Sequence, residues 1–260
     1  MKSLIRKVAS ALGYEVKREQ KASPPQSKFT SIEAFHSMMY QRHNARRLEH
    51  LASLRIPVAG MRVLELGAGI GDQTSYYLDR GCDVTITEAR GSNLEVLFRR
   101  FAEHTVVRLD MENPERVPGS PFDVIHCYGL LYHLTNPEQA IQFIRSHCST
   151  LFLETCVSFG SELAVNPVPE DAADHTQAIS GMGCRPTRPW LWQQLQRHFA
   201  HVYCPTTQPN HEEFPLDWKA PEKHQIAAPV LQRSVFVASS REIDNPLLSR
   251  DLLDIQIRHE

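Results

Sequence analysis

The residues best suited to chemistry are three alternating glycines in the segment RVLELGAGIGDQTSYYLDRG, residues 62–81. Gly67, Gly69 and Gly71 follow an apolar run that predicts a strand, and a helical pattern comes directly after them. Glycine costs conformational entropy in regular structure, so such a cluster marks a sharp turn or a backbone that a ligand approaches closely. A strand-to-helix turn also offers free N–H groups at the edge of a parallel sheet. The segment therefore predicts a binding site for a nucleotide-like ligand.

The acidic residues beside these glycines indicate the charge of that ligand. The dinucleotide-binding pattern G-x-G-x-x-G would need a third glycine at position 72, which is Asp72. Glu65 lies two residues before Gly67. A pyrophosphate would meet extra negative charge beside these two carboxylates. A cationic ligand without phosphate groups suits the loop better.

The stretch LELGAGIGD, residues 64–72, resembles the first motif of class I S-adenosylmethionine-dependent methyltransferases, a Rossmann-like superfamily. The resemblance implies S-adenosyl-L-methionine as the cofactor, whose sulfonium is positively charged. The cofactor-binding residues implied here are Glu65, Gly67, Ala68, Gly69 and Gly71. A tight turn that binds no ligand is the alternative that the motif leaves open.

Two further motifs follow in the order and spacing of that family. Glu88 ends the segment DVTITE and could accept hydrogen bonds from both ribose hydroxyls, although an acid at a strand end is also often solvated. Asp110, or its neighbour Met111, stands where the family contacts adenine, but Asp110 could equally be a turn residue before Pro114. The segment FDVIHCYGLLYHLTNP, residues 122–137, resembles the fourth-strand motif. The resemblance covers about residues 60–158.

A histidine and its neighbours are the candidates for catalysis and acceptor binding. Methyl transfer from a sulfonium is an in-line displacement, and a hydroxyl acceptor must also lose a proton. His133 follows the predicted fourth strand and is the candidate general base, unless it packs over the cofactor or caps a helix. Tyr132 could line the methyl-transfer site or belong to the core. Glu154 ends the predicted fifth strand and could bind the acceptor or be a buried, paired acid.

Two long segments without a regular pattern are expected to form the acceptor side of the site. Residues 159–187 include Arg185, which suits a carboxylate or a phosphate, and residues 207–232 include His211. Surface loops also carry such residues without any function. We therefore take Tyr132, Glu154, Arg185 and His211 as candidate acceptor-binding residues.

The pattern of apolar residues predicts the elements that position these groups. Strands are predicted at residues 62–66, 83–87, 105–109, 122–128, 150–155, 201–206 and 234–239. Helices are predicted at residues 30–55, 72–80, 92–102, 137–147 and 188–199. Alternation of strands and helices indicates an α/β fold with a doubly wound, mostly parallel, seven-stranded sheet. N-terminal helices and the two acceptor-side loops complete it.

Three regions follow from this pattern. Residues 1–28 form a basic amphipathic segment and a linker, residues 29–240 form the methyltransferase domain, and residues 241–260 form a C-terminal tail. The basic segment packs on the domain as a helix or makes peripheral contact with a membrane surface. No apolar stretch is long enough to span a bilayer, and no secretory signal is evident.

Composition limits the classes of function. The formal charge of −2 over 260 residues gives no overall electrostatic reason to bind nucleic acid. Six cysteines without a CxxC pair favour reduced thiols in the cytoplasm. Without HExxH or close Cys/His pairing, no metal site is expected. Oligomeric state cannot be read from the sequence.

Three functions remain open at this point. The first is methyl transfer from S-adenosylmethionine to a small-molecule or glycan acceptor, at oxygen. The second is RNA modification, because YGLLYHLTNPEQA is similar to the corresponding segment of enzymes that modify the wobble uridine of tRNA. The third is a non-catalytic protein that keeps the cofactor site for regulation or assembly.

Overall fold

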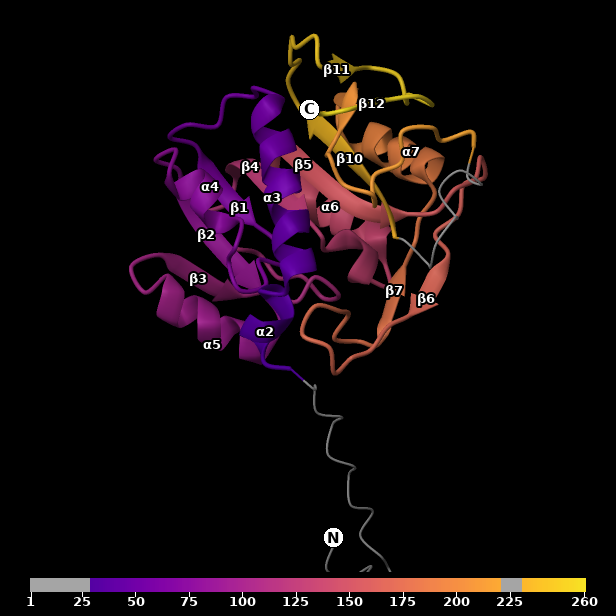
Figure 1. Cartoon of the computed structure of the whole chain (residues 1–260). Helices are drawn as coiled ribbons and strands as arrows, with labels where there is room; N and C mark the ends of the chain where they lie inside the picture. The colour runs from indigo at the N-terminus through magenta and orange to yellow at the C-terminus, as the bar shows by residue number, and fades with distance from the viewer. Residues whose placement is uncertain (1–28, 221–230) are drawn as a thin grey trace, which may run out of the picture.

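An eight-stranded sheet forms the centre of the protein, in a computed structural model that describes residues 29–220 and 231–260 (Figure 1). Its strand order is β11-β8-β10-β5-β4-β1-β2-β3. The strands are β1 (Arg62–Glu65), β2 (Asp83–Glu88), β3 (Thr105–Arg108), β4 (Phe122–Tyr128), β5 (Cys148–Val157), β8 (His201–Pro205), β10 (Gln232–Ser239) and β11 (Leu248–Ser249). The basic segment 1–28 and its predicted membrane contact lie outside the described residues.

The direction of the strands creates a crevice at the centre of the sheet. β1 pairs in parallel with β2 on one side and with β4 on the other, so Val63 has both Val84 and Val124 as partners. β2 with β3 and β4 with β5 are also parallel, whereas β10 is antiparallel to β5 and β8. The chain therefore winds outward in both directions from β1, and such a reversal opens a ligand-binding crevice at the carboxyl ends of the strands.

Helices cover both faces of this sheet, as a doubly wound fold requires. The helices are α2 (Ser31–Phe35), α3 (Met38–Ser53), α4 (Thr74–Leu78), α5 (Gly91–Arg100), α6 (Pro137–His147) and α7 (Arg188–His198), with the 3₁₀ turn η1 (Leu131–His133). Leu51, Tyr77 and Leu97 from α3, α4 and α5 share one apolar cluster. Ile144 and Leu191 from α6 and α7 belong to a second apolar cluster.

The predicted helix over residues 30–55 is two helices, because a second capping signal interrupts it. Thr30 and Glu33 form a capping box at the start of α2. Two residues after α2 ends, the Ser37 hydroxyl accepts the N–H of Tyr40 at 3.3 Å and starts α3. The break matters for function, because it turns the first residues of α3 toward the crevice.

All seven predicted strands are present, and the segments predicted to be irregular contain additional short pairs. Residues 159–187 contain an antiparallel hairpin of β6 (Pro167–Pro169) and β7 (Met182–Cys184). The expected tail contributes β11 to the edge of the main sheet, and its β12 (Ile257–Arg258) pairs with β9 (Thr207–Gln208). Two- and three-residue strands show no apolar alternation, so sequence pattern does not predict them. No helix in the described part of the chain is both long and apolar enough to cross a membrane.

Candidate active site

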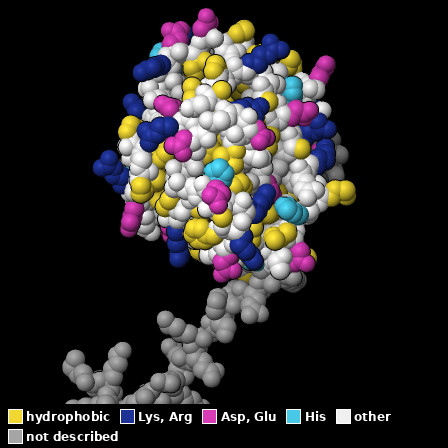
Figure 2. All heavy atoms as spheres, turned by 90° about the vertical axis from the view of Figure 1, so that its left-hand side faces the viewer, with side chains coloured by type: hydrophobic (Ala, Val, Ile, Leu, Met, Phe, Trp, Pro, Cys, Tyr) yellow, Lys and Arg dark blue, Asp and Glu magenta, His cyan; other side chains and the backbone are white. Residues whose placement is uncertain are grey.

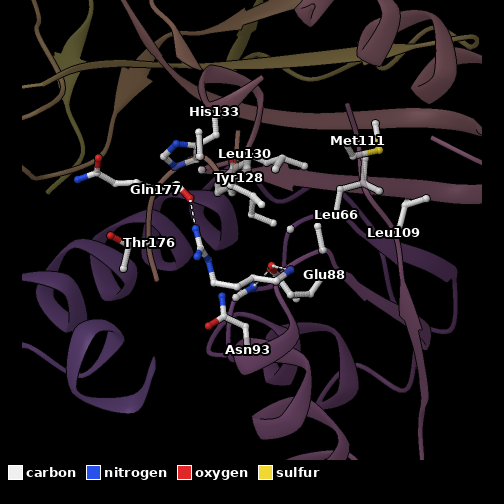
Figure 3. A pocket seen from close by; sticks show the side chains of 18 of the residues that line it. Leu66, Glu88, Asn93, Leu109, Met111, Tyr128, Leu130, His133, Thr176 and Gln177 are labelled. Atoms are coloured by element: carbon white, nitrogen blue, oxygen red, sulfur yellow. Dashed lines mark hydrogen bonds between the residues drawn. The ribbon is translucent and has the colours of Figure 1, made fainter. Parts of the chain in front are cut away.

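A cavity of about 320 Å³ lies at the carboxyl ends of β1, β2 and β4, and we call it the glycine-loop cavity (Figure 3). Of the eight predicted cofactor-binding residues, seven line it: Glu65, Gly67, Ala68, Gly69, Glu88, Asp110 and Met111. Its volume is within the range of ligand pockets. In Figure 3, Leu109 and Met111 lie at one end of the cavity and His133 lies at the other. Residues that are far apart in the sequence, from Phe35 to Ser180, thus line one cavity.

The glycine loop leaves almost no room for side chains. Gly67 and Gly69 have φ angles of 64° and 60°, in the left-handed region that glycine adopts readily. A Cβ atom on Gly67 would lie 2.9 Å from Leu130, and one on Gly69 would lie 2.6 Å from the ring of Phe35. Phe35 ends α2, so an N-terminal helix packs directly on the loop. Glycine is therefore needed at both positions for two reasons: the positive φ angle and the lack of space for a Cβ atom.

Gly71 has a different place from the other two glycines. It is outside the cavity lining, and a Cβ atom there would overlap the rings and methyl groups of Phe101 and Leu97. Those two residues belong to the packing of α5 and the residue after it. The structure thus places Gly71 at the contact between the loop and α5 rather than against a ligand.

The carboxyl of Glu65 is buried at the end of β1. Its Oε2 atom accepts a hydrogen bond of 2.6 Å from the hydroxyl of Thr74. Burial raises the pKa of Glu65 to about 7, and the nearby charge of Asp72 adds to the increase. Asp72 itself is paired with Arg100 at 2.7 Å. The site therefore holds an acid that a cationic ligand would help to ionise.

Glu88 ends β2 with both carboxylate oxygens held by the backbone. Oε2 accepts the N–H of Gly69 at 2.9 Å, and Oε1 accepts the N–H of Arg90 at 2.8 Å. Burial raises the pKa of Glu88, while these two hydrogen bonds oppose the increase. Each oxygen has a further lone pair, so the carboxylate can still accept two hydroxyl donors from the cavity.

Asp110 and Met111 occupy the next position along the cavity wall. The Asp110 carboxylate accepts the backbone N–H of Glu112 at 3.0 Å, which is the turn role that the sequence left open. Asp110 is exposed, whereas Met111 is buried and belongs to the apolar core. Both line the cavity, so the turn role and a ligand role are compatible.

His133 lies where two cavities meet. It ends η1 and lines both the glycine-loop cavity and a second cavity of about 580 Å³, which we call the histidine cavity. Tyr40, Thr176 and Gln177 also line both. Nδ1 of His133 forms a short hydrogen bond with a carboxylate oxygen of Glu170, at the end of the β6 segment. Burial lowers the pKa of His133, and the bond to Glu170 opposes the decrease.

Charged residues of the β6–β7 segment hold this pair in place. Both terminal nitrogens of Arg185 donate to Oε1 of Glu170 at 3.1 Å. Burial would raise the pKa of Glu170, but His133 and Arg185 lower it on balance. Arg185, expected to bind an acceptor, thus lies in the cavity wall, where two of its N–H groups donate to Glu170.

Glu154 lies beneath the histidine cavity and lines neither cavity. Its carboxylate accepts hydrogen bonds from Arg47 at 2.9 Å and from Arg233 at 3.0 Å, and all three side chains are buried. The two guanidinium groups lower its pKa although burial would raise it. Arg233 also donates to the hydroxyl of Tyr132 at 3.3 Å. The expected acceptor contact of Glu154 is therefore replaced by a structural one: it anchors residues that line the cavity.

The histidine cavity is also lined by residues that sequence reasoning missed. His211 and Glu213 belong to a loop that was expected there, but His43 and Arg233 were not expected. His43, Arg47 and His50 are buried polar residues at helical spacing on α3. A polar stripe on the buried face of a helix was the available signal. Its partners could not be predicted, because they come from distant parts of the chain.

The comparisons with known proteins agree with this geometry. The sequence profile of the family described as "Methyltransferase domain" matches residues 40–202, more than half of the chain. The chain belongs to this family. It is an S-adenosylmethionine-dependent methyltransferase, and its cofactor is S-adenosylmethionine.

Solved structures with low sequence identity share the fold of this methyltransferase. The N-terminal domain of EvdMO1, crystallised with S-adenosylhomocysteine (SAH) and D-fucose, is 18% identical with a TM-score of 0.59, covering 92% of this chain and 97% of that chain. A Mesorhizobium loti methyltransferase is 15% identical with a TM-score of 0.53, covering 76% and 99%. A Burkholderia thailandensis 1,6-didemethyltoxoflavin-N1-methyltransferase is 16% identical with a TM-score of 0.51, covering 88% and 99%.

A sequence relative covers a smaller part. An uncharacterised protein from Synechococcus sp. (strain ATCC 27144) is 29% identical over 101 residues, which are 35% of this chain and 24% of that protein. The chain thus matches about a quarter of that relative's length.

Proposed function

We propose that this methyltransferase transfers a methyl group to a hydroxyl oxygen of a small-molecule acceptor of the sugar type. The observation that carries the proposal is the His133–Glu170 pair at the junction of the two cavities. An imidazole oriented by a carboxylate is suited to removing a proton from a hydroxyl. It stands where the donor side and the acceptor side of a reaction would meet.

The glycine-loop cavity suits the cofactor along its whole length. When bound there, S-adenosylmethionine supplies an electrophilic methyl group on a sulfonium. The two lone pairs of Glu88 would hold the ribose hydroxyls, and Asp110 and Met111 would contact the adenine. Glu65 would face the cationic amino acid part. This orientation directs the methyl group toward His133, at the opposite end of the cavity from Met111 (Figure 3).

The protein groups around His133 would handle the acceptor proton. With Nδ1–H donated to Glu170, the neutral ring presents Nε2 as the proton acceptor. Glu170 then stabilises the imidazolium that forms, and Arg185 holds Glu170 in position.

The lining of the histidine cavity favours an uncharged, hydroxyl-bearing acceptor. Its arginines are already paired: the buried Arg47 and Arg233 with Glu154, and the half-buried Arg185 with Glu170. Histidines can donate to and accept from hydroxyl groups. The EvdMO1 domain crystallised in the presence of D-fucose supports a sugar as the acceptor, although at 18% identity the comparison shows only that the two proteins share a fold.

RNA is less well suited to this surface. On the face shown in Figure 2, lysine and arginine side chains are interspersed with acidic ones, and no basic stripe is visible. A protein that binds a nucleic acid backbone usually presents clustered positive charge.

A product analysis tests the proposal. Purified full-length protein is incubated with methyl-labelled S-adenosylmethionine and three acceptor sets: free and nucleotide-linked deoxysugars, small aromatic nitrogen heterocycles, and total tRNA. We expect labelled sugar whose methyl group is shown by NMR to be on oxygen. Label in tRNA or on a ring nitrogen, with none in sugars, would refute the proposed acceptor.

A further inference from the structure

Three side chains on one wall of the histidine cavity are arranged like the ligands of a metal ion. They are His43 of α3, and His211 and Glu213, which follow β9. One ligand atom from each lies within 4.8 Å of the other two. Nδ1 of His43 and Oε2 of Glu213 are 3.1 Å apart, and the two imidazole rings are 4.8 Å apart between centroids. Neighbouring ligands of a first-row metal, each about 2 Å from it, are about 3 Å apart.

The two histidine rings lie close to the acids of the same group. Nδ1 of His43 lies 3.1 Å from Oε2 of Glu213. Nδ1 of His211 accepts the backbone N–H of Glu213 at 3.3 Å, and Nε2 of His211 lies 3.7 Å from Oε1 of Glu212. An ion bound by Nδ1 of His211 would replace this long hydrogen bond.

One polar atom of the group has no partner within the protein. Nε2 of His43 is fully buried and forms no hydrogen bond among the described residues. Nδ1, and not Nε2, is the nitrogen 3.1 Å from Oε2 of Glu213, and an imidazole binds one ion through one nitrogen only. The orphaned Nε2 therefore shows that no described group holds the far side of this ring, and the ion is assigned to Nδ1. His43 itself is only 6% exposed, and it lines the cavity.

One oxygen atom of the Glu213 carboxylate is held by a hydrogen bond, and the other can still accept one. Arg233 donates to its Oε2 atom at 2.6 Å, and Oε1 accepts no hydrogen bond from the residues that the structure describes. A hydrogen-bond donor that holds a carboxylate in this way commonly fixes the orientation of a carboxylate that binds a metal. The charge of Arg233 works against a cation, but Glu154, shared with Arg47, offsets part of that charge.

We propose that His43, His211 and Glu213 bind one divalent first-row transition-metal ion at the wall of the histidine cavity. Two imidazoles and one carboxylate suit Zn²⁺, Fe²⁺, Co²⁺ or Mn²⁺ rather than Mg²⁺ or Ca²⁺, which prefer oxygen ligands. Three protein ligands leave at least one coordination position open. All three residues line the cavity assigned to the acceptor, so the ion would be available to acceptor oxygens in the cavity that His133 also lines.

The experiment measures metal binding directly and does not depend on finding the acceptor. Untagged full-length protein is stripped with a chelator, and Zn²⁺ and Mn²⁺ are titrated in by calorimetry. Co²⁺ is added in parallel, because its visible absorption reports nitrogen and oxygen ligands. We expect one ion per chain.

Variants assign the ion to its ligands. His43→Ala, His211→Ala and Glu213→Gln should each weaken binding at least tenfold, as loss of a ligand does. His104→Ala, at an exposed histidine elsewhere, should bind like the wild type, and so should His133→Ala. Calorimetry with SAH confirms that each variant is folded.

The outcomes separate this proposal from the proposed function. Absence of stoichiometric binding, or equal binding by Glu213→Gln and wild type, would overturn the metal site. In that case the group is a hydrogen-bonded cluster only. The protein could also bind one ion through the three ligands and yet methylate no sugar. That result would support the metal site and refute the proposed sugar acceptor.

Discussion

At the residue scale, the buried carboxyl of Glu65 links cofactor binding to pH. Its pKa of about 7 means that the free enzyme holds a proton there below pH 7. A cationic ligand favours the ionised form, so binding must release that proton, and affinity for S-adenosylmethionine should fall as the pH decreases below 7. Calorimetry at pH 6 and pH 8, in buffers of different ionisation enthalpy, measures both the affinity and the released proton.

Glu65→Gln is the matched variant for this test. It keeps the shape and the hydrogen bond from Thr74 but cannot titrate. We expect weaker binding that no longer varies over this pH range. A wild-type affinity that does not vary between pH 6 and pH 8 would contradict the raised pKa.

Glu88 should contribute to cofactor affinity through its two free lone pairs. Glu88→Ala leaves the ribose hydroxyls without acceptors, and we expect binding of SAH to weaken by about 1–3 kcal/mol. Asp83→Ala, at the exposed start of the same strand, is the control and should bind normally. Equal affinities for Glu88→Ala and Asp83→Ala would show that Glu88 does not face the ribose.

His133 and Glu170 should separate catalysis from binding. His133→Ala removes the proposed base, so kcat should fall by about 10² to 10⁴-fold while cofactor affinity changes only a few-fold. Glu170 raises the pKa of His133, so Glu170→Gln should move the acid limb of the kcat/KM profile to lower pH. Joint loss of affinity and rate in His133→Ala would indicate that the ring only packs over the cofactor.

At the element scale, the segment between β6 and β7 lies beside α2 (Figure 1), and its residues 175–180 line the glycine-loop cavity. Arg90 donates from its two terminal nitrogens to the carbonyl oxygens of Ala172 and Gln177, each at 3.0 Å. Nδ1 of His175 lies 3.0 Å from the hydroxyl of Ser31 and 2.9 Å from that of Ser92. These contacts hold the segment against α2 and α5.

Arg90→Ala should therefore loosen the hold on this segment. Loss of two hydrogen bonds, at about 1 kcal/mol each, should speed release of SAH by roughly tenfold or more. Stopped-flow fluorescence measures the release rate. Arg99→Ala, exposed on the same helix, should release the ligand at the wild-type rate. If the two variants release it equally fast, the segment does not act as a cover.

Elements were predictable where local patterns decide them. The seven main strands and α6 and α7 follow apolar periodicity, and Asn136 and Thr187 cap the two helices as their types predict. The break at Ser37 was missed, because a single capping serine competed with a continuous helical pattern. The cavity residues from β1 and β2 were predictable, because parallel strand ends meet at one edge.

At the scale of the whole molecule, Glu154 joins three distant parts of the chain. It lies on β5, while Arg47 comes from α3 and Arg233 from β10. Glu154→Gln leaves the buried guanidinium of Arg47 without a counter-charge and leaves Arg233 with Glu213 alone, so we expect a loss of about 3–5 kcal/mol in the free energy of unfolding. Urea denaturation measures it. Glu242→Gln, in an exposed pair with Arg250, should cost at most about 1 kcal/mol.

A small effect of Glu154→Gln would mean that the two arginines find other partners when the acid is neutral. The sequence left open that Glu154 is a buried, paired acid, but it did not identify the partners, because a strand-end acid shows nothing of the arginines that approach from other elements. The same holds for the pairing of His133 with Glu170, and for the meeting of His43 with His211. Local pattern specifies which face of the sheet an element covers, but not which polar groups meet across it.

The two cavities share part of their lining and differ in the rest. Tyr40, His133, Thr176 and Gln177 line both. The ends of β1 and β2 line only the glycine-loop cavity, whereas the residues around β9 and β10 line only the histidine cavity. No residue of the first three strands lines the second cavity. Substitutions around β9 and β10 can therefore accumulate over evolutionary time without altering the glycine loop or the carboxylates of Glu65 and Glu88. A lineage with this fold can therefore change its acceptor while it keeps the same site for the methyl donor.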